Sequence, residues 1–207
     1  MKHTGQMPAS SSSSPSGARS CWKFIWNCGA PPTVSNFAWR VATDGLPTWK
    51  NKHKIGLETT GICPVCGLET EDNFHPFLRC QFGRDLYMEM AKVWKLPNLQ
   101  SIANCGKEWL LQVLAPRSEL ERCMLLMIFW RSWFVRNELV HHKPAPPMEV
   151  SVRFLQSYVD SLLAIKHVMK LGHLDNRLAQ EKVKRTLPWT PGYSRLSKCP
   201  SRLTGQN

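Results

Sequence analysis

Residues 63–80 read Cys-Pro-Val-Cys-Gly-Leu-Glu-Thr-Glu-Asp-Asn-Phe-His-Pro-Phe-Leu-Arg-Cys. Three cysteines and one histidine fall within them at the spacing C-x2-C-x8-H-x4-C. Thiolate and imidazole are the groups that hold Zn²⁺ in tetrahedral structural sites, and a Cys-x-x-Cys pair followed this closely by His and Cys is typical of such sites. The spacing therefore predicts one zinc ion bound by Cys63, Cys66, His75 and Cys80. Unligated buried thiols and a redox pair remain the alternatives.

The predicted zinc site is structural rather than catalytic. Catalytic zinc keeps three protein ligands and one open position, whereas four protein ligands fill the shell here. No glutamate stands beside a ligand in the way that zinc deaminases require. We therefore expect the metal to contribute free energy of folding, and a chelator to unfold the region 57–85.

Composition favours a folded intracellular protein. The chain has 207 residues, of which 43% are hydrophobic, enough for a core in one domain or two small ones. No apolar run reaches the eighteen residues needed to cross a bilayer, and the N-terminus lacks the apolar core of a signal peptide. The cysteines outside the zinc pattern are scattered, which suits a reducing compartment better than a disulfide scaffold. The sequence leaves nucleus and cytoplasm equally open.

Basic residues gather at both ends of the chain. The net charge is +12, and residues 1–62 hold seven basic and two acidic residues, while residues 166–207 hold nine and two. Such flanks are typical of a protein that binds a polyanion such as RNA or DNA. Solvated basic surface with disordered tails explains the same distribution equally well. No feature of the chain indicates a small-molecule substrate.

The first half of the chain predicts short helices around the cysteines. Apolar residues between 34 and 41 recur at i, i+3, i+4 and i+7, which predicts an amphipathic helix with Gly45 as its left-handed C-terminal residue. Thr48 is expected to cap a second helix over residues 49–55. A third helix is expected to begin at Thr70 and to contain the histidine ligand. Pro76 is the weak point of that helix, because proline beyond the first turn breaks the hydrogen-bond ladder.

The second half predicts longer helices. After a short helix over residues 107–114, Ser118 to Glu121 form a capping box that opens a helix to about Val140, and Pro147 opens another to about Leu171. The apolar side of the first long helix is predicted to comprise Leu120, Met124, Met127, Ile128, Trp130 and Phe134. We find no alternating strand pattern. The fold is therefore predicted to be mainly α, a small helical zinc-binding module followed by a helical region with two longer helices.

Composition also suggests boundaries between these parts. Residues 1–20 contain five consecutive serines and form a predicted disordered Ser-rich tail. The zinc-binding domain is predicted over residues 21–97 and a helical linker region over residues 98–172. Residues 173–207 form a basic tail that we expect to be disordered.

One stretch next to the cysteines combines an aromatic ring with positive charge. Residues 49–54 read Trp-Lys-Asn-Lys-His-Lys. Lysines on such a helix can bind phosphates, and the ring can stack on an unpaired base. A solvated helix face with the tryptophan packed on the core is the plainer interpretation. The candidate nucleic-acid contacts are Arg40, Trp49, Lys50, Lys52 and Lys54.

Several separated motifs occur in an order that resembles a known family. They are Phe37-Ala38-Trp39-Arg40, Leu46-Pro47-Thr48, Cys63-Pro64-x-Cys66-Gly67, and Glu69-Thr70-Glu71-Asp72 before His75 and Cys80. Over about residues 22–95 this order is similar to the zinc-binding domain that follows reverse transcriptase in plant LINE-type (non-LTR) retrotransposons. The resemblance implies that the three cysteines and the histidine are zinc ligands. It also implies a helical module in a polyprotein that copies RNA into DNA.

The resemblance also bears on catalysis. Residues 108–190 resemble, more weakly, the segment that links that domain to ribonuclease H in such elements, and Pro188 to Tyr193 resemble the entry to the ribonuclease H fold. The strand with its metal-binding aspartate does not follow, and the chain has no Asp-Asp pair for a polymerase site. We therefore expect no enzyme activity.

The sequence supports three readings of function. The first is a structural zinc-binding module derived from a non-LTR reverse transcriptase that binds RNA or DNA weakly and without catalysis. The second is a zinc-stabilised protein-interaction module. The third is a gene remnant that does not fold as a unit.

Overall fold

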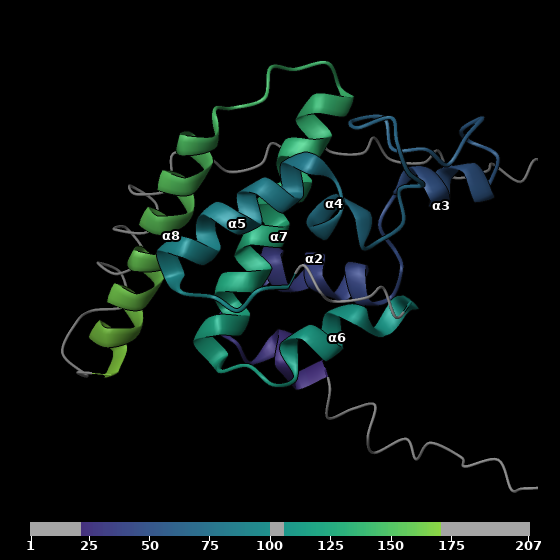
Figure 1. The fold of residues 1–207 in the computed structure, drawn as a ribbon. Coiled ribbons are helices and arrows are strands. Elements are labelled where there is room, and N and C mark those ends of the chain that lie inside the picture. The colour runs from purple at the N-terminus through teal and green to yellow at the C-terminus, as the bar shows by residue number, and fades with distance from the viewer. Residues whose placement is uncertain (1–21, 100–105, 171–207) are drawn as a thin grey trace, which may run out of the picture. The chain divides into compact units, whose positions relative to one another are not determined.

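The computed structural model describes residues 22–99 and 106–170, and within them the protein is mainly α-helical (Figure 1), as predicted. Residues 22–26 form a short helical segment. The other helices are α2 (Pro32–Ala42), α3 (Trp49–Lys54), α4 (His75–Leu78), α5 (Gln81–Trp94), the 3-10 turn η1 (Gly106–Glu108), α6 (Trp109–Leu114), α7 (Glu119–Val140) and α8 (Met148–Lys170). Strand-like pairing in these residues is limited to an isolated antiparallel bridge between Ile62 and Thr70. The predicted tails at 1–20 and 173–207 lie outside the described residues.

Two compact units divide the chain, Met1–Gln156 and Ser157–Asn207, with the boundary inside α8. In the second unit the described part is the remainder of α8, where Ser161 Oγ donates a hydrogen bond to the Ser157 carbonyl at 2.8 Å. The first unit contains all the other helices. None of the helices in the described residues is long and apolar enough to cross a membrane.

Helix α7 lies at the centre of the first unit. It packs against α2, α4 and α5 (Figure 1). Its start is the predicted capping box, in which Ser118 Oγ accepts from the Glu121 N–H and the Glu121 carboxylate accepts from the Ser118 N–H at 2.8 Å. Because helices cover several of its sides, α7 is buried almost all round. The helix ends at Val140, as predicted.

The predicted apolar side of α7 was only partly correct. Met127 and Ile128 are buried, but Leu120 is 38% exposed. The apolar side chains that the prediction left out and that are buried in α7 are Cys123, Leu125, Leu126, Phe129, Trp133 and Val135. A helix that packs on more than one side has no single apolar stripe, so its periodicity predicts only part of its buried surface.

Aromatic rings connect the two halves of the sequence. Phe77 of α4 is fully buried, and its ring centroid lies 5.8 Å from Phe37, 5.5 Å from Phe129 and 5.9 Å from Trp109. These are the separations at which aromatic pairs attract beyond simple burial. Helices α2 and α4 therefore share one core with α6 and α7.

Helix α2 buries the predicted face, but its C-terminus differs from the prediction by one residue. Asp44, not Gly45, has the left-handed conformation, with φ of 57°. The Asp44 N–H donates to the Val41 carbonyl at 3.1 Å, and the Gly45 N–H to the Arg40 carbonyl at 2.7 Å. These two bonds form a Schellman motif, in which aspartate is one of the few non-glycine residues that tolerate the left-handed position.

The predicted helix from Thr70 was wrong. Thr70 pairs with Ile62 instead, and α4 begins only at His75. The Asp72 carboxylate accepts from the N–H groups of Phe74 and His75 at 3.0 and 2.9 Å, so it caps this later start. The later start also removes the difficulty with Pro76. It is the second residue of α4, where its missing N–H would have no partner in the helix.

Candidate metal centre

Residues 61–71 form a tight turn, here called the knuckle, that presents two of the cysteines. The Cys63 N–H donates to the Glu69 carbonyl at 2.8 Å, and the Glu71 N–H to the Gly61 carbonyl at 2.9 Å. Gly67 closes the turn by donating its N–H to the Cys63 carbonyl at 2.9 Å. Its φ of 68° is the left-handed conformation that glycine adopts without steric cost.

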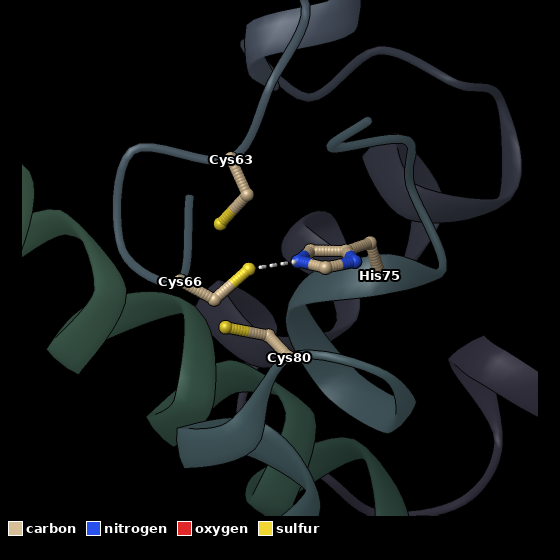
Figure 2. A group of neighbouring side chains, drawn as sticks. All are labelled: Cys63, Cys66, His75 and Cys80. Atoms are coloured by element: carbon tan, nitrogen blue, oxygen red, sulfur yellow. Dashed lines mark hydrogen bonds between the residues drawn. The ribbon is translucent and has the colours of Figure 1, made fainter. Parts of the chain in front are cut away.

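The four predicted ligands meet at one point. The sulfur atoms of Cys63, Cys66 and Cys80 and a ring nitrogen of His75 all lie within 4.8 Å of one another. Figure 2 shows these side chains pointing toward a common centre, with Cys66 Sγ 3.4 Å from His75 Nε2. Cys66 is half-buried and the other three are buried. The knuckle supplies two ligands, the first residue of α4 the third, and the residue before α5 the fourth.

The donor set and its spacing fit zinc. Zinc bonds of about 2.3 Å to sulfur and 2.0 Å to nitrogen place tetrahedral ligand atoms roughly 3.5–3.8 Å apart. The contact between Cys66 and His75 is already close to this separation, and the whole cluster needs little contraction. The second ring nitrogen of His75, Nδ1, is buried without a hydrogen-bond partner and lies 3.5 Å from the Glu69 carboxylate. A carboxylate at this position orients a ligating histidine.

Hydrogen bonds within the cluster divide its protons unequally among the four side chains. A hydrogen bond from the Cys80 thiol, aided by one from His75, lowers the pKa of Cys63 to about 3. The same bond raises the pKa of Cys80. Burial lowers the pKa of His75, but hydrogen bonds and Coulombic attraction from Cys63 and Cys66 outweigh it and raise that pKa to about 9. A metal ion that binds here must therefore displace protons from His75 and Cys80, because zinc takes thiolate and neutral imidazole as ligands.

Glu71 is part of this centre, and sequence reasoning missed its role. Its side chain is fully buried and accepts two hydrogen bonds from Arg136 of α7, from Nε at 2.8 Å and from Nη2 at 2.5 Å. The Cys63 thiol lies 3.8 Å from the same carboxylate, and the Trp49 N–H donates to it at 2.8 Å. The sequence pattern places Glu71 in a helix start instead. No local pattern indicates a partner 65 residues away.

The candidate nucleic-acid contacts differ in their surroundings. Thr48 caps α3 as predicted, accepting from the Asn51 N–H at 3.3 Å. Trp49 is half-buried, with Lys52 Nζ 4.3 Å from its ring centroid, and Lys52 is also 3.6 Å from the Glu58 carboxylate. Lys50 and Lys54 are exposed. Among the described residues neither has a carboxylate within 4.0 Å.

Arg40 lies in a different environment. It is exposed, and its Nη2 donates to the Gly45 carbonyl at 3.2 Å, at the turn that follows α2. Trp49 therefore has a cation over its ring, Lys52 has an acidic partner, and Lys50, Lys54 and Arg40 present their charge to solvent. The prediction that these five residues contact nucleic acid stays a prediction.

A family model built from known proteins matches part of the chain. Residues 9–87 match a family model described as zinc-binding in reverse transcriptase. The match includes the knuckle and all four clustered ligands, and it covers less than half of the chain. Neither the curated proteins nor the solved structures contain a match. Over this segment the chain is therefore similar to the zinc-binding region of reverse transcriptases.

Proposed function

We propose that the protein is a zinc-binding module of the reverse-transcriptase type, that its one Zn²⁺ is structural, and that it binds RNA or DNA weakly and without catalysis. We further propose a LINE-type, plant retrotransposon origin, which the order of the sequence motifs supports. The observation that carries the zinc assignment is the convergence of three cysteines and one histidine within 4.8 Å, inside the segment that matches the zinc-binding family.

The metal would be held by Cys63, Cys66, His75 and Cys80. These four ligands complete a tetrahedral shell, so the ion supplies folding free energy and has no position at which to activate water. The burial of three of the four ligands supports the same role, because substrate would have to enter through protein.

The zinc assignment is tested by metal analysis of purified protein. We expect about one zinc ion per chain, the capacity of a single Cys3His shell. Replacing Cys66 with Ser should abolish it, and this half-buried position disturbs the core least. Aggregation of the wild-type chain without metal uptake would contradict the proposal and favour a non-functional gene remnant.

Nucleic-acid binding is proposed for the exposed cations beside the knuckle. Lys50 and Lys54 are four residues apart and so lie on one side of α3. Arg40 lies beside the turn that follows α2. The Asp44 and Leu46 carbonyls of this turn accept hydrogen bonds from the Asn51 side chain of α3. A small set of exposed cations without acidic neighbours suits phosphate contacts that carry no sequence preference. Half-buried beneath Lys52, Trp49 is better placed to support α3 than to stack on a base.

The binding proposal is tested by titrating labelled single-stranded RNA and duplex DNA at several salt concentrations. Each phosphate contact contributes about −0.7 to −0.9 to the slope of log affinity against log salt. Changing Lys50 and Lys54 to Gln should therefore weaken binding and make the slope shallower by about 1.4 to 1.8. The matched control changes Lys92 and Lys143 to Gln, two exposed lysines that pair with Glu89 and Glu138. If both double variants weaken binding equally, then binding depends on net charge and not on Lys50 and Lys54 in particular.

A second candidate function has its own observation. Three large aliphatic side chains in and near the knuckle are exposed to solvent, Ile55 and Leu57 by 69% each and Leu68 by 82%. Apolar exposure of this kind is typical of protein contact. Absence of binding to either nucleic acid at low salt, in a chain that holds zinc, would favour this protein-interaction module.

A further inference from the structure

Helix α3 depends on polar contacts rather than on packing. It spans six residues and buries none of its side chains. A helix this short does not persist in water by itself, so the groups that bind its ends must hold it in place. Asn51 provides one attachment, because its side-chain amide donates to the carbonyls of Asp44 and Leu46 at 3.0 Å each. Glu71 provides the other.

Glu71 satisfies the first two backbone donors of α3. Its carboxylate accepts from the Trp49 N–H at 2.8 Å, and its main-chain carbonyl accepts from the Lys50 N–H at 3.1 Å. These donors have no partner within the helix itself. One residue of the knuckle therefore caps the helix that carries the proposed phosphate contacts.

Glu71 is itself fixed from two directions. Its main chain is bonded to Gly61 within the knuckle, whose geometry also places Cys63. Its carboxylate receives the two hydrogen bonds from Arg136, whose guanidinium lies 5.6 Å from the ring centroid of Trp49 and 4.7 Å from that of Trp133. A buried carboxylate and guanidinium each need the other, because removing one leaves an uncompensated charge.

We infer that Glu71 and Arg136 couple occupancy of the metal site to the position of α3. The inference rests on the proposed zinc binding. A metal that binds Cys63 fixes the knuckle, the knuckle fixes Glu71, and Glu71 fixes the first turn of α3. Arg136 is a positioning residue in this arrangement, since it acts through the Glu71 carboxylate. Coupling between two sites is reciprocal, so an oligonucleotide bound at α3 strengthens zinc binding by the same factor.

The test is hydrogen exchange of the full chain with and without zinc, followed by mass spectrometry. In the wild type, zinc should slow exchange in the peptide covering α3 by about 5- to 150-fold, the usual range for coupled sites. In the Glu71→Gln and Arg136→Gln variants, zinc should still bind at the same stoichiometry and still slow exchange in α5. The slowing at α3 should be largely lost.

Two controls separate coupling from general damage. Glu89→Gln removes a surface carboxylate of α5 that pairs with Lys92 and contacts neither α3 nor a predicted ligand, and it should keep the full response. Asn51→Ala removes the other attachment of α3, so exchange should be faster with and without zinc while the response to zinc remains. If Arg136→Gln does not fold, Arg136→Lys keeps the charge without the paired donors and should give an intermediate response.

The outcomes are distinguishable. Normal slowing at α3 in the Glu71 and Arg136 variants overturns the coupling, as does a loss in Glu89→Gln equal to that in Glu71→Gln. Zinc uptake by the wild type with unchanged exchange at α3 overturns the coupling and leaves the proposed zinc function standing. Absence of zinc uptake overturns both.

Discussion

Gly83 of α5 lies tightly against the backbone of α4 beside the metal centre. A Cβ atom added there would lie 2.0 Å from the Pro76 carbonyl oxygen, a backbone atom that cannot move aside without shifting α4. We predict that Gly83→Ala lowers the free energy of unfolding by about 3 kcal/mol or more. Urea denaturation measures the loss. The control is Gly56→Ala, where φ is 75° and no atom lies within 4 Å, so only backbone strain of about 1 kcal/mol is expected.

Tyr87 gives the protein a specific alkaline sensitivity. Its hydroxyl donates to the Pro97 carbonyl, and burial raises the pKa of Tyr87 to about 12, whereas the unfolded value is near 10. The protonated phenol therefore stabilises the fold fully below pH 10, and this contribution is lost as the pH rises toward 12. We predict that Tyr87→Phe costs about 1 kcal/mol at pH 8. That deficit should shrink by about 1.4 kcal/mol per pH unit above pH 10 and so be gone by about pH 11, measured by denaturation at each pH. A constant deficit would contradict the assignment.

At the residue scale, local chemistry determined what could be predicted. A single ion imposes its spacing on a short stretch of chain, so Cys63, Cys66, His75 and Cys80 could be identified as a group from the sequence. The partnership of Glu71 with Arg136 could not, because packing of α7 creates it. The left-handed residue after α2 was predicted at Gly45 and is Asp44. Both residue types can adopt this conformation, so the sequence does not choose between them.

Among the elements, α7 has the clearest local start. Ser118 and Glu121 exchange hydrogen bonds between side chain and backbone, and the Ser118 backbone and side-chain hydrogen bonds lower the pKa of Glu121. We predict that Ser118→Ala destabilises the protein by about 1 kcal/mol, because the Glu121 N–H loses its acceptor. Thermal denaturation should show it, with the exposed Ser157 of α8, changed to Ala, as a control that costs little. A cost equal to that of the control would mean that α7 needs no cap.

Elements with strong local signals were predicted well, and those that depend on neighbours were not. The capping box and Pro147 marked the starts of the two long helices correctly because each acts within one turn. Helix α4 was placed five residues too early. Acidic residues such as Glu71 and Asp72 are typical of a helix start. Here Glu71 is instead buried in the core, where it is paired with Arg136 of α7.

At the scale of the whole molecule, metal content should control stability. If zinc binds only the folded chain, each tenfold increase in free zinc above the dissociation constant adds about 1.4 kcal/mol to the free energy of unfolding. We predict that the thermal midpoint rises with free zinc, and that a chelator lowers it and unfolds the region 57–85. Calorimetry in zinc buffers provides the measurement. Cys66→Ser should remove the dependence, and a midpoint insensitive to zinc in the wild type would contradict the structural role.

The fold class could be predicted from the whole sequence because helical periodicity recurs along it. The arrangement could not. Helix α7 belongs to the predicted linker region, yet it supplies Phe129 to the aromatic core around Phe77 and Arg136 to the metal centre. A helix's own periodicity states that it has an apolar side, but not which helices will cover it. The compact unit consequently extends well beyond the segment that matches the zinc-binding family.

The buried pair of Glu71 and Arg136 has a consequence for how such sequences can diverge. A change at either position alone leaves an uncompensated charge in the core, which costs about 3–5 kcal/mol. Exchange of both for uncharged residues of similar volume avoids that penalty. In related chains, positions 71 and 136 should therefore be replaced together. Substitutions in the knuckle and in α7 are therefore expected to be linked, although the knuckle lies inside the segment that matches the zinc-binding family and α7 lies outside it.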